Sequence, residues 1–226
     1  LYGFADDADV RADEVTSRGP DGMAFTLVAA GERNAVTIPG LGRLAVHNAL
    51  AGAAAGLAAG LRSADIARSL AAGWSAPHRG QLVRAGGVTI VDDSYNASPG
   101  SVAAALEALA GMPGRRIAVL GAMLELGDEH DAGHRRTGEA AAAVVERLVV
   151  VGDEAAGLAE AAAAAGLAPD AIERAPDRAA ARDHLVKALR PGDVVLVKAS
   201  RGVALDVLVD ELATALGPAL AEQPGR

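Results

Sequence analysis

The segment VTIVDDSYNASPGSVAAALEALA, residues 88–110, decides the fold of the larger part of this chain. It begins with a short β-branched apolar run, Val88–Val91, passes through a cluster of polar residues, and continues as a helical pattern from Pro99 to about Ala110. A strand followed at once by a helix is the repeating unit of α/β folds. Ser98 and Pro99 add a helix-start signal, because serine caps helices and proline favours the first helical position.

The same alternation continues from residue 88 to residue 216. Further strands are expected at Ile117–Leu120, Leu148–Val151 and Val194–Val197. Helices are expected near 99–110, 131–146, 154–165, 177–189 and 203–216. This βαβα series predicts right-handed crossovers and a Rossmann-like, mostly parallel sheet with helices on both faces. Ligands of such sheets bind beyond the carboxyl ends of the strands. The loops expected at those ends are 92–98, 121–128, 152–153 and 198–202.

The residues before this series show a different pattern. Strand signals at Ala24–Ala29 and Ala35–Ile38 are separated by turn-prone segments at Arg18–Gly22 and Gly31–Asn34, which is typical of antiparallel strands. A helix of small residues is expected over 47–60, and Ser63 is expected to cap a second helix that runs to about Ala72. Periodicity is lost between Gly73 and Gly87, so we expect a domain boundary near Trp74–Arg79. The predicted domains are therefore residues 1–76 and residues 77–226.

Composition narrows the class of protein. The chain has 51% hydrophobic but only 2% aromatic residues, so its core must be built from Ala, Val and Leu. A formal net charge of -8, with no Lys/Arg-rich run, argues against a nucleic-acid partner. The sequence shows neither a signal peptide nor an apolar stretch that could span a membrane. The absence of cysteine fits a reducing compartment, and the cytoplasm is the expected location. The sequence does not determine the oligomeric state, although a monomer is favoured.

Polar side chains gather directly after the strand at residues 88–91. Two adjacent carboxylates, Asp92 and Asp93, are followed by the hydroxyl of Ser94, the phenol of Tyr95 and the amide of Asn96. At the carboxyl end of a strand, this set can bind ribose hydroxyls and the edge of a nucleobase. The alternative is that the segment only starts the following helix.

Four motifs, in one order along the chain, resemble those of the MurF-type Mur ligases. VDDSYNASPGS (residues 91–101) is similar to that family's DDSYNANP segment, and LGAMLELGDEHDAGH (residues 120–134) to its LGDMLELG segment with a following acidic stretch and histidine. VKASR (residues 197–201) resembles VKGSR, and His47-Asn48 matches the first half of HNxxN. The chain departs from these patterns where Ala51, Ser98 and Ala122 replace Asn, Asn and Asp.

The resemblance implies an ATP site. Asn48 would approach the adenine, Asp93 would bind the ribose, and Arg79 would reach toward the phosphates, while Tyr95 and Asn96 would face the nucleotide. Two alternatives stay open. Asn48 could cap a helix, since Asn before a run of Ala and Leu is a common helix start. Arg79 could be a solvated charge in a linker.

The resemblance also implies a site for the acceptor, D-alanyl-D-alanine. Lys198, Ser200 and Arg201 form a cationic and hydroxyl cluster that suits a carboxylate, although Lys198 could instead be a surface charge. Met123 and Leu124 would lie near the bound peptide or pack in the core. His130 and His134 share a helical face, but no third ligand is evident, so we expect no metal there.

The expected activity is that of an ATP-dependent ligase joining UDP-MurNAc-tripeptide to D-alanyl-D-alanine in peptidoglycan synthesis. The chain contains no GxxxxGK[ST] motif, so the P-loop, the Mg²⁺ ligands and the catalytic residues are expected outside it, and the chain alone is expected to be inactive. One alternative is a Mur ligase that adds a single amino acid, although such enzymes more typically show a DYAHTP-like segment. The other is a non-catalytic module that binds a nucleotide or a peptide.

Overall fold

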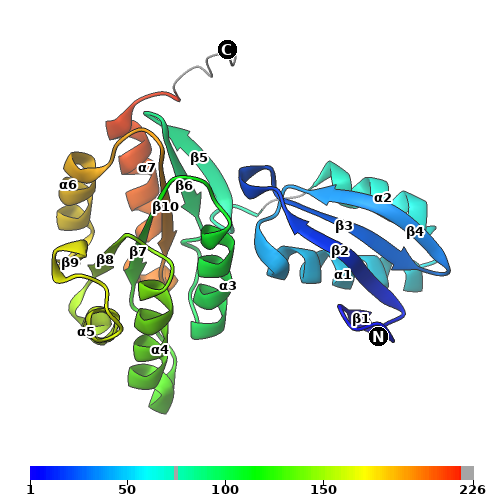
Figure 1. The fold of residues 1–226 in the computed structure, drawn as a ribbon, viewed down its shortest axis with the longest axis horizontal. Helices are drawn as coiled ribbons and strands as arrows, with labels where there is room; N and C mark the ends of the chain where they lie inside the picture. The colour runs from blue at the N-terminus through cyan, green and yellow to red at the C-terminus, as the bar shows by residue number, and fades with distance from the viewer. Residues whose placement is uncertain (74–75, 220–226) are drawn as a thin grey trace. The chain divides into compact units, whose positions relative to one another are not determined.

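The chain divides into two compact units, Leu1–Ser75 and Ala76–Arg226. The computed structural model describes residues 1–73 and 76–219, and each unit is considered by itself (Figure 1). Residues 74 and 75, which lie in the stretch where we expect the domain boundary, are outside the described residues.

The first unit packs two helices against a sheet. Within the described residues its sheet has the order β1-β2-β3-β4, in which β2, β3 and β4 are antiparallel and β1 runs parallel to β2. The strands are β1 (Tyr2–Gly3), β2 (Val10–Ser17), β3 (Met23–Ala29) and β4 (Glu32–Ile38). The helices are α1 (Gly42–Ala58) and α2 (Ser63–Ala72), and a 3-10 turn, η1 (Gly19–Asp21), joins β2 to β3. Alternate side chains of β3, such as Phe25 and Leu27, meet Val46 and Leu50 of α1 in the core.

Two expectations for this unit were wrong. Helix α1 begins at Gly42 rather than near residue 47, so Asn48 lies inside the helix and cannot be its cap. Ser63 does not cap α2, because the N-cap is Arg62 and the Ser63 hydroxyl is turned toward the sheet. That hydroxyl is buried and accepts a hydrogen bond from the Asn34 side chain over 2.9 Å, which ties α2 to β4.

The second unit is built on a mostly parallel sheet, as the sequence predicts. Over the described residues its strand order is β5-β6-β10-β7-β8-β9, and only the β5–β6 pair is antiparallel. The strands are β5 (Gln81–Ala85), β6 (Val88–Asp92), β7 (Arg115–Gly121), β8 (Arg147–Val151), β9 (Ile172–Ala175) and β10 (Asp193–Lys198). The last strand in sequence, β10, therefore lies between β6 and β7, which places a topological switch point at the centre of the sheet.

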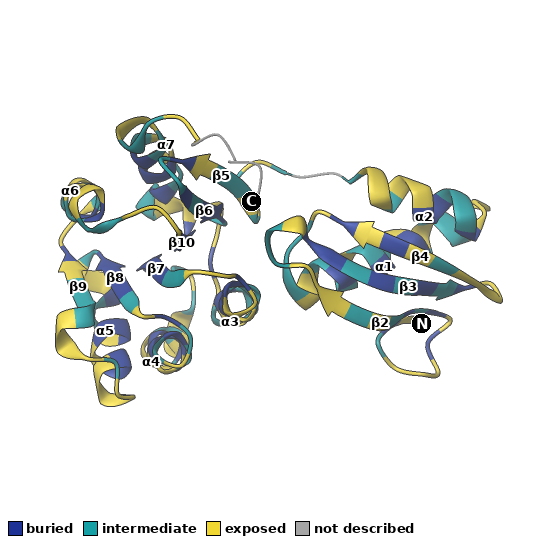
Figure 2. Ribbon diagram, turned by 45° about the horizontal axis from the view of Figure 1, so that its top comes forward, coloured by how far each residue is buried: buried dark blue, intermediate teal, exposed yellow. Residues whose placement is uncertain are grey.

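Helices cover both faces of this sheet (Figures 1 and 2). Helices α6 (Arg178–Ala188) and α7 (Leu205–Leu216) lie on one face, and α3 (Pro99–Ala110), α4 (His130–Ala142) and α5 (Ala156–Ala164) lie on the other. Figure 2 shows the inner strands β6, β10, β7 and β8 mostly buried between these two layers, whereas the edge strands β5 and β9 are more exposed. On the α6–α7 side, Val119 and Val195 of the sheet pack with Leu185 and Leu208. Four 3-10 turns complete the loops: η2 (Gly127–Glu129), η3 (Asp153–Ala155), η4 (Pro169–Ala171) and η5 (Arg201–Val203).

The strands and helices expected from residue 88 onward are confirmed, with ends shifted by a few residues. Two short strands of the second unit were missed, as was β2 of the first unit. The stretch from Gly73 to Gly87, which has no clear periodicity, contains β5, which pairs with β6 through a turn at Gly86 and Gly87, both with positive φ. The edge strand β9 lies where no strand was expected.

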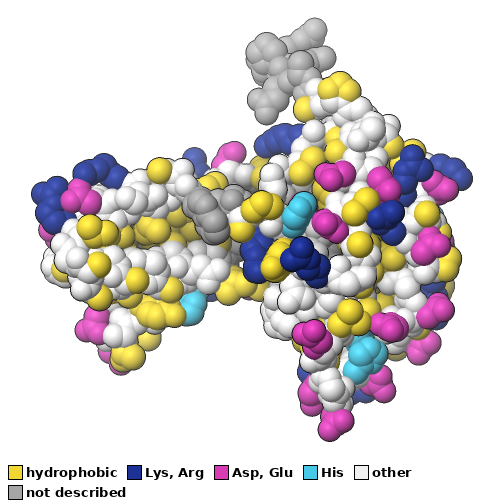
Figure 3. All heavy atoms as spheres, turned by 180° about the vertical axis from the view of Figure 1, so that it is seen from behind, with side chains coloured by type: hydrophobic (Ala, Val, Ile, Leu, Met, Phe, Trp, Pro, Cys, Tyr) yellow, Lys and Arg dark blue, Asp and Glu magenta, His cyan; other side chains and the backbone are white. Residues whose placement is uncertain are grey.

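None of the described helices combines the length and the hydropathy that a membrane span requires. On the face shown in Figure 3, acidic and basic side chains of the described residues are interspersed, so that face carries no extended positive patch.

Candidate functional site

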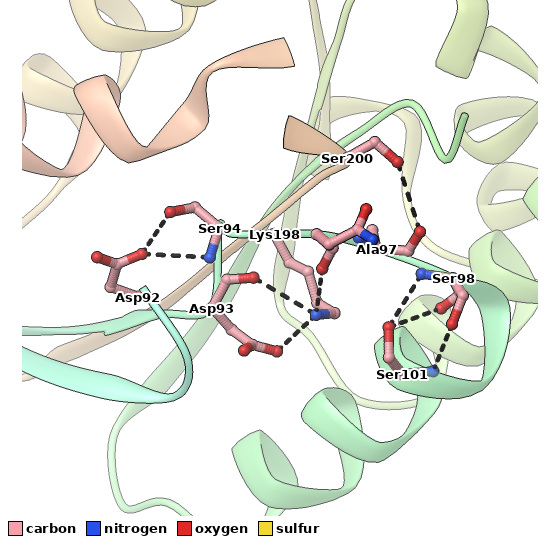
Figure 4. A network of polar contacts seen from close by, with 9 residues as sticks. Asp92, Asp93, Ser94, Ala97, Ser98, Ser101, Lys198 and Ser200 are labelled. Atoms are coloured by element: carbon pink, nitrogen blue, oxygen red, sulfur yellow. Dashed lines mark hydrogen bonds and ion pairs between the residues drawn. The ribbon is translucent and has the colours of Figure 1, made fainter. Parts of the chain in front are cut away.

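Three loops meet at the carboxyl edge of the second unit's sheet. Because β10 lies between β6 and β7, the loop after β10 can contact both the loop after β6 and the loop after β7. These contacts are made by two buried side chains, Lys198 at the end of β10 and Ser200 in the loop after it (Figure 4). The three loops therefore form one connected polar network.

Asp92, the last residue of β6, anchors the loop that follows this strand. This buried carboxylate accepts hydrogen bonds from the Ser94 amide at 3.2 Å and the Ser94 hydroxyl at 2.5 Å. Its other oxygen lies 2.8 Å from Nδ1 of His78, and the hydrogen bond to Asp92 raises the pKa of His78. The His78 carbonyl in turn accepts the Tyr95 amide at 3.1 Å. The turn that precedes β5 is thus fastened to the loop after β6.

The second carboxylate of this loop, Asp93, pairs with Lys198. The ammonium lies 2.6 Å from Oδ2 of Asp93 and 2.8 Å from the carbonyl of Asn96. Burial raises the pKa of Asp93, and Lys198 opposes that rise most strongly, followed by the Gly80 amide and Arg79. The Asp93 carboxyl stays 24% exposed, whereas the Lys198 side chain is 3% exposed.

Tyr95 projects outward between two guanidinium groups. The residue is 37% exposed, and the guanidinium carbons of Arg79 and Arg201 lie 4.3 Å and 5.2 Å from the ring centroid. Both distances are in the cation–π range, and Arg201 also lies 3.5 Å from the phenol oxygen. Both arginines are exposed, so this Arg79–Tyr95–Arg201 cluster offers a flat aromatic surface beside two positive charges.

The loop after β7 is held at two successive amides. The Met123 amide donates to Nε2 of His134 at 3.0 Å, and the Leu124 amide donates to the Ser200 hydroxyl at 2.9 Å. His134 is buried and its Nδ1 lies 2.8 Å from the His130 carbonyl, so Nδ1 must carry the proton and Nε2 must accept. His134 is therefore used as a structural clamp. Across residues 1–73 and 76–219 no three His, Cys, Asp or Glu side chains gather as metal ligands.

The predicted helix start at Ser98 is confirmed. Ser98 and Ser101 form a reciprocal capping box, and Pro99 occupies the first turn of α3. Where the family has Asn at position 98, serine therefore still provides a cap. At the other departure in this unit, Ala122 is buried and its carbonyl accepts the Ser200 amide at 3.0 Å, so the main-chain contact persists without a polar side chain.

The predicted site residues fall into three groups. Those that gather at this edge are Arg79, Asp93, Tyr95, Asn96, Lys198, Ser200 and Arg201. Asn48 belongs to the first unit, where it is exposed on α1. Met123 is 1% exposed and its sulfur faces the Thr137 hydroxyl, so it packs in the core, whereas Leu124 is half-buried.

Two residues that organise the site were not identified from sequence as such. His78 was visible only as the neighbour of Arg79, and nothing local indicates that it pairs with Asp92 across 14 residues. His134 was considered as a metal ligand, yet both of its ring nitrogens are used in hydrogen bonds with the backbone. Their partners come from other elements, which sequence spacing does not reveal.

The side chains described at this edge of the sheet have the chemistry needed to bind a nucleotide. The Asp93 carboxylate can accept hydrogen bonds from hydroxyls, Tyr95 offers a stacking surface, and Arg79 can neutralise phosphate charge. A shallow, mostly apolar depression also opens at this edge, lined in part by Gly152, Arg178 and Val203. Val203 follows Arg201 by two residues, so the depression borders the same loop.

Comparison with known proteins gives one consistent family. Residues 78–201 match the family model described as "Mur ligase, glutamate ligase domain". The UDP-N-acetylmuramoyl-tripeptide--D-alanyl-D-alanine ligase of Mycobacterium tuberculosis is 41% identical over 214 residues, covering 83% of this chain and 41% of that relative. The chain thus spans about two fifths of the length of this relative.

Solved structures agree. A MurF structure from Acinetobacter baumannii superimposes with a TM-score of 0.83 at 28% identity, covering 94% of this chain and 46% of that one. A MurF ligase from Thermotoga maritima in complex with ADP gives a TM-score of 0.81 at 26% identity, covering 96% and 48%. From the motifs, the fold and these matches, the chain belongs to the Mur ligase family.

Proposed function

We propose that this chain acts as part of an ATP-dependent ligase that adds D-alanyl-D-alanine to UDP-MurNAc-tripeptide. The observation that carries the proposal is the polar cluster at the switch point of the sheet, where Asp93, Tyr95 and Arg79 present an accessible carboxylate, a stacking surface and a cation. The relatives named for this activity support the choice of substrates. Residues 1–76 would then be the end of the central nucleotide-binding domain, and residues 77–226 the C-terminal domain.

In this proposal each exposed group has a distinct task. Asp93 accepts hydrogen bonds from the ribose hydroxyls, and Tyr95 and Asn96 face the nucleotide. Arg79 neutralises phosphate charge. The nucleotide supplies the phosphoryl group that activates the tripeptide carboxylate for attack by the acceptor amine. These residues bind and orient the nucleotide, while the groups acting on the γ-phosphate, together with the Mg²⁺ ligands, belong to other parts of the complete ligase.

The acceptor is assigned to the loops after β7 and β10. Arg201 is exposed and can pair with the dipeptide carboxylate, while Leu124 and the depression beside Val203 offer apolar contact for its methyl groups. Ser200 shapes this region through its bond to the Leu124 amide. Lys198 is not retained as a direct contact, because its ammonium is buried against Asp93 and Asn96.

The proposal is tested by ATP-dependent phosphate release in the complete ligase. Release is expected only when UDP-MurNAc-tripeptide and D-alanyl-D-alanine are both present, and not when single amino acids replace the dipeptide. Equal turnover with a single amino acid would assign the chain to another Mur ligase activity. The isolated 226-residue chain is expected to release no phosphate.

A matched pair of variants tests the site itself. Asp93→Ala is expected to raise the KM for ATP, since the ribose contact is lost while other parts of the ligase still hold the phosphates. Asp170→Ala is the control, because Asp170 is exposed in η4, before β9 and so at the opposite edge of the sheet. If Asp93→Ala lowered thermal stability but left the KM for ATP equal to that of the control, Asp93 would have no role in nucleotide binding.

A further inference from the structure

Lys198 is the last residue of β10, and its side chain is almost completely enclosed. Its ammonium is 2.6 Å from Oδ2 of Asp93, 2.8 Å from the Asn96 carbonyl and 3.4 Å from the Asp93 carbonyl. An ammonium has three N–H donors, and here there are three acceptors, all in the loop after β6 (Figure 4). The ammonium therefore has no donor left for a ligand.

The strand order explains how Lys198 reaches this loop. Val197 of β10 is in register with Asp92 of β6, and the Asp93 amide donates to the Val197 carbonyl at 3.1 Å, which extends the ladder by one residue. The side chain of the next residue, Lys198, is thereby placed beneath the turn formed by residues 93–96. Two strands far apart in sequence, β6 and β10, are needed to create this arrangement.

A buried ammonium is costly unless it is paired with a charged group. Its only charged partner at hydrogen-bond distance among the described residues is Asp93, so the pair is stable only while Asp93 is ionised. The other charged groups near Asp93 are Arg79, in the turn before β5, and Asp92 on its own loop, which is paired with His78. Burial raises the pKa of Asp93, and Lys198 is the largest influence that opposes the rise.

We propose that Lys198 is a positioning residue that keeps the Asp93 carboxylate charged and fixed, with Oδ2 held by the ammonium, so that the partly exposed carboxylate can accept hydrogen bonds from the vicinal hydroxyls of a nucleotide ribose. Figure 4 shows the second carboxylate oxygen of Asp93 pointing away from the ammonium. The ligand in this inference rests on the proposed nucleotide site, whereas the effect of Lys198 on Asp93 does not. Lys198 thus acts on ATP through Asp93, and it does not contact the acceptor dipeptide.

The first experiment measures the titration of the Asp93 carboxyl carbon by ¹³C NMR in the 226-residue chain. Lys198→Met keeps an unbranched apolar side chain of similar length but removes the charge. It is expected to raise the pKa of Asp93 measurably, because the opposite charge that counteracts burial is removed. Lys187→Met is the matched control, because Lys187 is exposed on α6 and should leave the pKa of Asp93 unchanged. An unchanged pKa in Lys198→Met would overturn the proposal.

A second variant covers the case in which Lys198→Met does not fold. The double variant Asp93→Asn with Lys198→Met removes both charges and leaves no unpaired ion, so it is expected to fold even where a single variant fails. If Lys198→Met does not fold, a folded double variant shows that the unpaired Asp93 charge causes the failure, and a double variant that also fails to fold contradicts the proposal. Where both single variants fold, the stability of the double variant relative to them gives the coupling between the residues. Additive stability losses, which mean no coupling, would contradict the ion pair as the basis of the role.

The last experiment uses the complete ligase and separates this inference from the proposed function. Lys198→Met is expected to raise the KM for ATP, with a loss that grows as the pH falls through the raised pKa of Asp93 and shrinks at higher pH. The KM for D-alanyl-D-alanine should change less, and Lys187→Met should change neither. A selective rise in the dipeptide KM would restore Lys198 as an acceptor contact and refute the positioning role. If Lys198→Met changed the pKa of Asp93 but not the KM for ATP, the ion pair would be supported and the nucleotide contact at Asp93 would be refuted.

Discussion

Ser200 links the loops on either side of β10, and Ser200→Ala tests whether that link holds the loop after β7. The hydroxyl is buried, accepts from the Leu124 amide at 2.9 Å and lies 3.4 Å from the Ala97 carbonyl. The shorter bond is the one that matters, because the longer one is near the limit of a hydrogen bond. Alanine keeps the size of the residue nearly constant and removes only the hydroxyl.

The expected effect follows from the amide that is left unpaired. A buried donor without a partner costs about 1–3 kcal/mol, and since Leu124 is half-buried we expect about 1–2 kcal/mol. At about 1.4 kcal/mol per factor of ten, exchange of the Leu124 amide hydrogen should accelerate roughly 5- to 30-fold. The Met123 amide, which is bound to His134, should accelerate less.

Amide hydrogen exchange followed by NMR on the 226-residue chain is the assay. Thr214→Ala is the control, because it removes an exposed hydroxyl that bonds a carbonyl within α7 in the same unit. Exchange of the Val195 amide, in the centre of the sheet, reports any general loss of stability. If the Leu124 amide exchanged equally fast in Ser200→Ala and in the wild type, Ser200 would not be holding this loop.

Two further predictions concern stability. The pKa of His78 is raised by its bond to Asp92, so its contribution is fully present below the ordinary histidine pKa of about 6.5 and is lost as the pH rises through the raised value. The urea midpoint of His78→Ala should therefore fall further below wild type at pH 5.5 than at pH 9, and equal gaps would contradict this role. Gly138→Ala would place a methyl group 2.2 Å from a carbonyl oxygen of α5 and should lower the free energy of unfolding by about 1–3 kcal/mol. Gly157→Ala, which faces open space on α5, should raise it by about 0.5–1 kcal/mol. Thermal unfolding of both glycine variants checks this, and a neutral Gly138→Ala would mean that α4 and α5 can separate easily.

Much of the second unit could be predicted from sequence because its signals are local. The β-branched run Val88–Val91 is buried and reads as a strand without reference to any partner. Ser98 and Pro99 start α3 by hydrogen bonds and backbone geometry that involve only their neighbours.

The elements that were missed depend on partners elsewhere in the chain. The strand β2 contains Arg11, Asp13 and Glu14, and its charges are satisfied by pairing across the sheet, as between Asp13 and Arg33. The strand β5 is short and lies at an edge, so its alternation is weak, and only its pairing with β6 defines it. Ser63 was misread for a similar reason, since its partner Asn34 lies 29 residues away.

The sequence by itself determined the alternation of strands and helices, the family motifs and the polar residues at the end of β6, because each of these depends only on residues that are close together along the chain. Only the tertiary structure decided what those residues contact. Placing β10 between β6 and β7 makes Lys198, which was expected to bind the acceptor carboxylate, the buried partner of Asp93, and it leaves Arg201 exposed beside Tyr95. Strand order is set by the packing of whole helices against both faces of the sheet, so no local pattern around Lys198 could have revealed it.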